Sequence, residues 1–210
     1  MLKRLTLTCW LIASAAYAQN WYLGAVGGYG YAPKLTIGGV TPEAKTGLDN
    51  GGVLGAYFGE DTHNYWSGEV HYLHRWDSLA ISFGGTNVKF AGHSDILHAD
   101  FLRHFAPRGS KVRPFIAAGG GMRFLAGSGN ESSSQPLGNY AALTATRESL
   151  PVVDAAVGVR VKFSKRAEIR FEVRDYMSPA PSKVIAPAPG ASLSGWLNDI
   201  VGSVSIGYSF

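Results

Sequence analysis

Two short stretches of the sequence carry residue types that could perform acid–base or metal chemistry. Glu69 and His71 are two residues apart, and so are His98 and Asp100. If both stretches are β-strands, each pair lies on one face of its strand, because alternate residues of a strand point the same way. An imidazole beside a carboxylate can serve as a general base, and both groups are common zinc ligands. One hypothesis is therefore a hydrolytic or metal-binding cluster.

The sequence does not supply the rest of such a site. Nucleophilic catalysis needs a hydroxyl or thiol beside the base. Ser94 directly follows His93 and would point to the opposite face of a strand. The six histidines never occur two residues apart, so no strand presents two imidazoles side by side. We therefore predict no catalytic residue, no metal site and no cofactor, and keep a lipid-modifying enzyme only as an alternative.

Charged residues of both signs also occupy alternate positions later in the chain, opposite apolar neighbours. Enclosed charges are tolerable only when they are paired, and here acids and bases occur in similar numbers. We predict that they interlock and fill the interior of the fold. The predicted network consists of Glu69, His71, His98, Asp100, Arg160, Glu168, Arg170, Glu172 and Arg174.

The elements that must position these charges are strands. Period-2 alternation marks eight segments, most of them about 10 to 15 residues long by this criterion. Ordinary strands are near 5–6 residues, whereas a tilted transmembrane strand needs roughly 9–11. The segments are 20–32, 50–59, 64–76, 93–105, 112–126, 151–163, 168–174 and 199–210.

The connections between these segments alternate in length. Three are short, and the four long ones (33–49, 77–92, 127–149 and 178–196) are rich in glycine, proline, serine, asparagine and alanine. Short turns on one side of a membrane and long loops on the other are typical of outer-membrane barrels. We predict an all-β fold, an eight-stranded antiparallel up-and-down transmembrane β-barrel. Its apolar residues should face lipid, not a core, and its long loops should face outward.

Composition agrees with this fold and excludes others. Of 210 residues, 27 are glycine and only 16% are charged, while 46% are apolar. Typical soluble domains have about 7% glycine and about 25% charged residues, and a disordered chain has far fewer apolar ones. Glycine-rich runs such as 119–121 fit strands of a tightly closed barrel. No dense run of lysine and arginine supports a nucleic-acid partner.

The start of the chain has the pattern of a secretory signal peptide. A basic start is followed by an apolar stretch and by the small-x-small site Ala16-Tyr17-Ala18, so we predict a leader over 1–18 and a barrel domain over 19–210. The only cysteine, Cys9, falls within the leader, and removal of Lys3 and Arg4 lowers the net charge from +4 to +2.

Large aromatic residues lie near the ends of several predicted strands. Trp21 and Tyr29 flank the first segment, and Trp66 and Trp76 flank the third. Aromatic girdles at both membrane interfaces are typical of transmembrane barrels. We predict that these four residues belong to such girdles.

Several stretches resemble the OmpA- and OmpX-like family of eight-stranded outer-membrane β-barrel domains. The opening Trp21-Tyr22-Leu23-Gly24-Ala25, the stretch 113–121 and the stretch 171–176 are similar to its first, fifth and seventh strands. The resemblance implies that the terminal strand, with Val204, Ile206, Tyr208 and Phe210, is the signal read by the barrel-assembly machinery.

Fold and resemblance together predict an exported, integral protein of the bacterial outer membrane. We expect a non-catalytic role in envelope integrity or in surface interaction through the long loops, with an unknown surface partner. Membrane lipid and lipopolysaccharide should surround the barrel. A narrow channel or small-ligand carrier is the alternative. It requires a continuous lumen, whereas the interior of an eight-stranded barrel is just wide enough for side chains to fill it.

Overall fold

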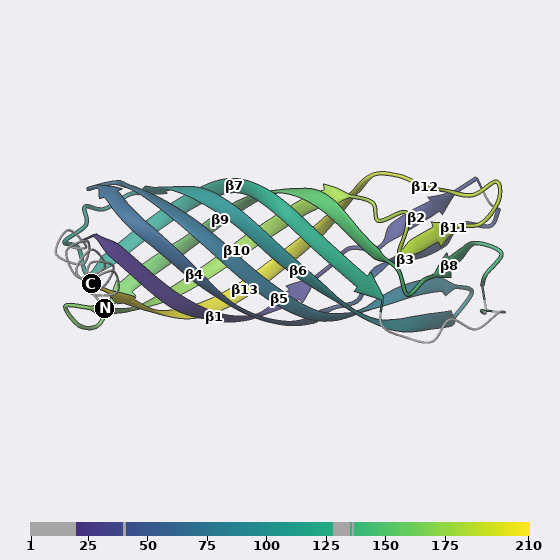
Figure 1. Cartoon of the computed structure of the whole chain (residues 1–210), viewed down its shortest axis with the longest axis horizontal. Helices are drawn as coiled ribbons and strands as arrows, with labels where there is room; N and C mark the ends of the chain where they lie inside the picture. Colours follow the sequence, from purple (N-terminus) through teal and green to yellow (C-terminus); the bar gives the residue numbers. More distant parts are fainter. Residues whose placement is uncertain (1–19, 40, 128–134, 136) are drawn as a thin grey trace, which may run out of the picture.

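The computed structural model describes residues 20–39, 41–127, 135 and 137–210. The predicted signal peptide lies outside these residues. The described chain is built of strands, arranged as a long barrel with an extension at one end (Figure 1). Within these ranges, no helix is long and apolar enough to cross a membrane.

Eight long strands form a closed antiparallel ring. In ring order β1 is followed by β4, β5, β6, β7, β9, β10 and β13, and pairing of β13 with β1 completes the circle. This confirms the predicted eight-stranded barrel. The strands are β1 (Trp21–Tyr31), β4 (Gly51–His63), β5 (Trp66–Phe83), β6 (Thr86–His104), β7 (Val112–Gly127), β9 (Arg147–Lys162), β10 (Ala167–Pro179) and β13 (Trp196–Ser209).

The three short connections lie at the end of the barrel where the chain ends, which we call the terminal end (Figure 1). The predicted long loop 77–92 does not exist as a loop. β5 and β6 run on to a two-residue turn at Gly84 and Gly85, and stay paired from Trp66↔Arg103 to Phe83↔Thr86. Both glycines have positive φ, 54° and 84°, as a tight hairpin turn requires at its two central positions. The two glycines form the turn. The apolar and polar residues on either side alternate only weakly, so the sequence did not indicate that the strands continue there.

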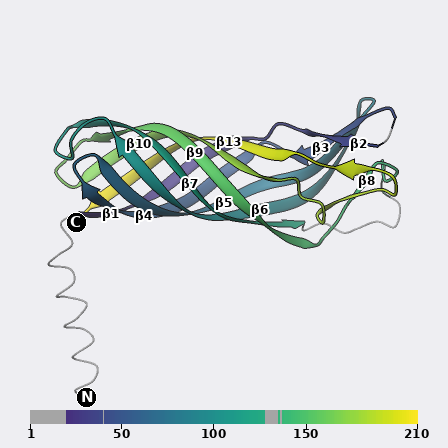
Figure 2. The same ribbon diagram turned by 90° about the horizontal axis from the view of Figure 1, so that it is seen from above.

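The other three long connections, which were predicted as loops, also contain short strands. Together with the outer ends of β5 and β6 they form the extension, which we call the cap. Figure 2 shows it continuing beyond the barrel. Its short strands are β2 (Leu35–Gly38), β3 (Ala44–Leu48), β8 (Ala141–Leu143), β11 (Ile185–Pro187) and β12 (Ser192–Leu193).

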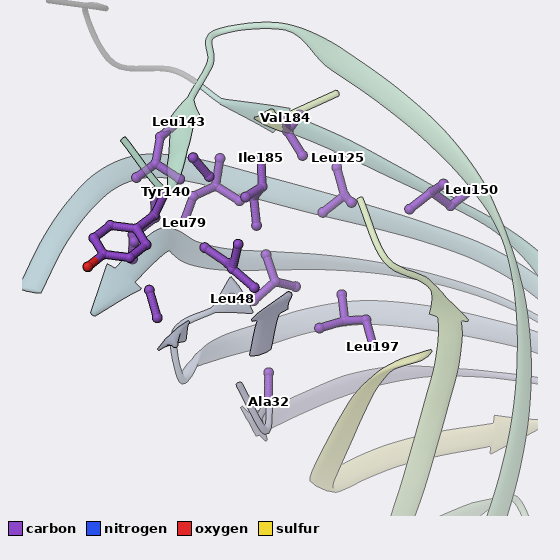
Figure 3. Packing of buried hydrophobic residues seen from close by; sticks show 14 residues of the cluster. Ala32, Leu48, Leu79, Leu125, Tyr140, Leu143, Leu150, Val184, Ile185 and Leu197 are labelled. Carbon is purple, nitrogen blue, oxygen red and sulfur yellow. The ribbon is translucent and has the colours of Figure 1, made fainter. Parts of the chain in front are cut away.

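The cap encloses a hydrophobic core, so the expectation that apolar residues only face lipid is wrong here. Fourteen buried residues form one cluster, contributed by barrel strands and by the connections (Figure 3). Ile37, Leu48, Ile81, Leu143 and Ile185 are each fully buried in it. Apolar burial of this kind stabilises a fold by roughly 25 cal/mol per Å², which explains why the described parts of these connections pack on the barrel strands.

A polar contact also ties the cap to the barrel mouth. The Lys34 and Lys89 ammonium groups lie 2.5 and 2.7 Å from the two carboxylate oxygens of Asp49. Partial burial disfavours the charged carboxylate, but the hydrogen bonds from both lysines outweigh it and lower the pKa of Asp49. Through Asp49, these two ion pairs join Lys34, just before β2, to Lys89 in the β5–β6 hairpin.

The outer face of the barrel is apolar and carries the predicted girdle residues. Tyr29, Trp66 and Trp76 are exposed on this face, and Trp21 is half-buried against Phe58 with ring centroids 4.8 Å apart. Trp66 and Trp76 are ten residues apart on β5. At a tilt of about 40° and about 3.3 Å per residue, this separation spans roughly 25 Å, the height of the apolar band of such barrels. Their assignment to girdles stays a prediction that this spacing supports.

The buried cap core generates a stability prediction. Replacing Ile37 by alanine should lower the free energy of unfolding by about 2–5 kcal/mol, because the truncation leaves a cavity in a packed site. The neighbouring Thr36 is exposed on the same strand, so Thr36→Ala should change stability by no more than about 0.5 kcal/mol. Denaturant titration of the protein in lipid vesicles measures both. Equal losses would contradict an apolar core in the cap.

Candidate functional site

The interior of the barrel holds ionised side chains in three layers along its length. The layer at the terminal end is centred on Asp61, which receives hydrogen bonds from Arg113 Nη1 (2.9 Å) and Arg160 Nη1 (3.2 Å). Arg160 Nε also donates to Glu168 Oε1 at 2.7 Å, and its guanidinium lies 4.1 Å from the centre of the Tyr22 ring. Two carboxylates therefore face two guanidinium groups in this layer.

The middle layer begins with a bidentate ion pair. Arg170 Nη1 and Nη2 donate to Glu69 Oε2 and Oε1 at 2.8 and 2.5 Å. The Tyr22 hydroxyl also donates to Glu69 Oε1 at 2.6 Å, and His71 Nε2 lies 2.7 Å from Glu69 Oε2. Two parallel N–H···O bonds fix the carboxylate in plane and are among the stronger pairings available to it.

Arg174 links the remaining carboxylates of the middle layer. Its Nε donates to Glu172 at 2.7 Å, and its Nη1 contacts Asp100 Oδ2 at 2.5 Å and hydrogen-bonds to Asp154 Oδ1. His98 lies between the two aspartates, with Nδ1 2.9 Å from Asp100 Oδ1. One guanidinium thus joins strands from opposite parts of the ring.

The third layer, toward the cap, is centred on Asp199. This carboxylate accepts hydrogen bonds from Arg75 and from Arg123 Nη2, the latter at 3.1 Å. Arg75 Nη2 also donates to the backbone carbonyl of Asp49 at 2.7 Å, so the uppermost charges are connected to the base of the cap.

Glycines provide the room for these large side chains. A Cβ at Gly30 would lie 2.2 Å from Arg75 Nη1, and one at Gly119 would lie 2.0 Å from Asp100 Oδ1. Real Cβ atoms do not approach other atoms so closely. At Gly119 the backbone oxygen of Ala99 would also lie 2.3 Å from such a Cβ, so this position requires glycine, whereas at Gly30 the end of the arginine side chain would have to shift.

The structure buries all nine residues of the predicted network in the lumen, each at most 9% exposed. The quartet Glu69, His71, His98 and Asp100 is brought together by direct pairing of β5 and β6, Glu69 with Asp100 and His71 with His98. The paired imidazole rings stack with centroids 4.7 Å apart. This contact joins two strands, and the spacing of histidines along one strand does not reveal it.

Three central lumen residues were missed by the sequence argument: Asp61, Arg75 and Asp199. Asp61 was assigned to a short turn, but β4 continues through it to His63. For Arg75 and Asp199, the signal was their position in the period-2 alternation of their strands. Arg75 shares the alternation of Glu69 and His71, and Asp199 shares that of Ser203 and Ser205, so the period-2 rule would have placed both inside.

Little space remains between these side chains. A cavity of about 10 Å³ is lined by His71, Arg170, Glu172, Arg174 and Tyr176 among others. That volume holds about one water molecule. The lumen at this level is filled by the protein's own side chains.

The ion pair between Glu69 and Arg170 permits a direct test of this packing. Arg170→Met should lower the unfolding free energy by about 3–5 kcal/mol, because it leaves a buried carboxylate without its cation. Combining it with Glu69→Leu should recover most of that loss. Denaturant unfolding in vesicles measures the series. A double variant as unstable as Arg170→Met would contradict the pairing.

Comparisons with known proteins bear on the fold alone. No family model matches the sequence, and no curated protein matches it. Among solved structures, Neisserial surface protein A is 11% identical with a TM-score of 0.57, over 90% of this chain and 97% of that one. The outer membrane protein OprG from Pseudomonas aeruginosa is 13% identical with a TM-score of 0.54, over 91% and 97%.

The inverted polarity of the barrel agrees with these similarities. Apolar side chains cover the outside, charged side chains fill the inside, and ring closure leaves no open sheet edge within the barrel, as a membrane-spanning sheet requires. By its fold, the chain is an eight-stranded outer-membrane β-barrel.

Proposed function

We propose that the protein is a closed, non-catalytic barrel that anchors its cap at the cell surface, in a structural or surface-interaction role. The observation that carries this proposal is the filled lumen. Three layers of paired charges cross the barrel, and the cavity beside the middle layer measures about 10 Å³. The alternative, a channel or small-ligand carrier, would need a continuous path through these layers.

The contacts of the lumen also argue against catalysis there. His98 and Asp100 were considered as a general-base pair, but His98 Nε2 lies 3.1 Å from the Tyr176 hydroxyl, so both ring nitrogens have partners. The carboxylate is itself held by Arg174. A general base needs to reach a substrate proton, and a space the size of one water molecule admits no substrate.

The cap supports a role at the surface. It has its own apolar core and is continuous with β5 and β6, so it would hold a defined surface above the membrane. We also propose contacts of the outer face with membrane lipid and lipopolysaccharide.

The terminal strand and its end expose four residues on the outer face: Val204, Ile206, Tyr208 and Phe210. Their side chains are accessible to the barrel-assembly machinery before lipid covers them, which supports the proposal that they form the assembly signal.

The closed lumen predicts an absence of conductance. The wild-type protein reconstituted in planar bilayers should produce no stepwise current, because the paired side chains of the three layers would block the passage of ions. Liposome swelling with small sugars provides a second measurement on the same preparation. Reproducible current steps, abolished by Arg174→Ala, would overturn the closed-barrel proposal in favour of a channel.

Orientation can be tested by labelling introduced cysteines, since the chain's only cysteine is Cys9 in the predicted leader. Thr86 is exposed beside the cap hairpin turn, and Ser164 is exposed in a turn at the terminal end. A membrane-impermeant maleimide should label Thr86→Cys in intact cells, and Ser164→Cys only after permeabilisation. The reverse pattern would place the cap in the periplasm.

A further inference from the structure

Two turns at the terminal end carry charge of one sign only. They are residues 105–111, between β6 and β7, and residues 162–166, at the end of β9 and before β10. Neither stretch contains an aspartate or a glutamate, and together they hold five basic residues: Arg108, Lys111, Lys162, Lys165 and Arg166. We infer that these two turns form a binding site for an anionic phospholipid, held by its phosphate.

The two turns lie side by side because β7 and β9 are paired. The backbone N–H of Lys162 donates to the carbonyl of Lys111 at 2.8 Å, and Lys162 Nζ donates to the carbonyl of Arg108 at 2.8 Å. An open groove of about 410 Å³ lies at this junction, lined by Gly109, Lys111, Lys162, Phe163, Ser164 and Lys165. Small molecules usually bind in pockets of roughly 300–1,000 Å³. Three lysines therefore border one groove large enough for a phospholipid headgroup.

The protein does not neutralise these lysines. Among the described residues, no carboxylate oxygen lies within 4.0 Å of the ammonium group of any of the three. Asp61 and Glu168, in the adjoining charge layer, are already held by Arg113 and Arg160. Glu60 lies on β4, four strands away from β9 in either direction around the ring. A cleft lined by charges of one sign attracts the opposite charge, so the groove favours an anion.

Hydrogen-bond donors also point to phosphate. Ser164 Oγ accepts hydrogen bonds from the backbone N–H groups of Arg166, at 3.2 Å, and Ala167, at 3.0 Å. A hydroxyl that accepts in this way can still donate its own hydrogen. Each lysine ammonium group has three N–H donors, and Lys162 directs one of them to a backbone carbonyl. The groove thus combines positive charge with several donors, as phosphate oxygens require.

The apolar surface beside the groove distinguishes a lipid from a dissolved anion. Phe163 lines the groove and is 59% exposed, and Phe105 on the neighbouring turn is 62% exposed. Arg166 Nη1 donates to the hydroxyl of Tyr208, which lies on the outer face of the barrel. The basic turns therefore meet the lipid-facing surface. A phospholipid fits both parts, with acyl chains against the phenyl rings and its phosphate among the lysines.

The charge of the headgroup follows from the same lining. A zwitterionic headgroup carries its own ammonium group, which the lysines would repel, whereas a headgroup with net negative charge brings no such cost. The cap offers no equivalent at its lysine pair, because Lys34 and Lys89 are both bound to Asp49. The inference rests on the proposed orientation of the protein, in which the terminal end meets the leaflet that faces the periplasm.

The test measures lipid binding to the protein extracted in detergent micelles, by native mass spectrometry during titration with phosphatidylglycerol or phosphatidylethanolamine. Phosphatidylglycerol should bind at least about 10-fold more tightly. The double variant Lys111→Gln with Lys165→Gln should weaken this binding at least about 10-fold, since each lysine near an anionic surface contributes about fivefold. Both side chains are exposed, so this variant should fold. Raising the salt from 0.1 to 1 M should also weaken binding, because the Debye length falls from about 10 to about 3 Å.

Two exposed lysines of the cap provide a matched control. Lys45→Gln combined with Lys183→Gln removes the same charge at the opposite end of the molecule, and should leave phosphatidylglycerol binding unchanged. Inorganic phosphate at the same concentration as the lipid should not displace it, because phosphate lacks the acyl chains that contact the phenyl rings.

Four results would overturn the inference. They are equal affinity for the two lipids, full binding by the Lys111 and Lys165 double variant, an equal loss in the cap control, and displacement of the lipid by inorganic phosphate, which would assign the groove to a dissolved anion. Micelles have no sides, so these results do not depend on the orientation of the protein. Labelling of Ser164→Cys tests that orientation separately.

Discussion

The pairing of β13 with β1 closes the barrel, and the other features of the molecule depend on that closure. Backbone N–H and C=O groups that face lipid have no water to bind, so a sheet can span a membrane only as a ring without edges. In a ring of eight strands, successive side chains point alternately to lipid and to a narrow interior. Closure therefore decides that the apolar residues lie outside and that the charged residues are forced together.

The interior then has to satisfy two opposing demands. Arginine side chains are large, and their charges are costly to enclose without a carboxylate. Glycine answers the demand for space, as at Gly30 beside Arg75 and at Gly119 beside Asp100. Carboxylates from distant strands answer the demand for charge, as where Glu69 on β5 pairs with Arg170 on β10. The high glycine content and the pairing of enclosed charges are two aspects of one packing solution.

Apolar side chains point inward in the cap, unlike in the barrel. Above the membrane, apolar residues again gain by leaving water, and Ile37, Leu143 and Ile185 are fully buried together. The same chain thus turns its apolar residues outward in the barrel and inward in the cap. The direction in which apolar side chains point changes along β5, because its surroundings change from lipid to water. Trp76 lies on the outer face of the barrel, and Ile81 lies in the cap core.

The sequence by itself determined the eight barrel strands and the side of each that carries charge, because alternation is a local property of neighbouring residues. It also placed nine lumen residues, and parity would have placed Arg75 and Asp199 as well. The sequence did not predict the elements that are held in place by contacts with residues far along the chain. The cap strands are short and weakly patterned, and are held by a core drawn from several connections. Only the tertiary structure decided that His71 lies on His98 and that Asp154 reaches the same layer, because register between strands, and not spacing within one, brings these side chains together.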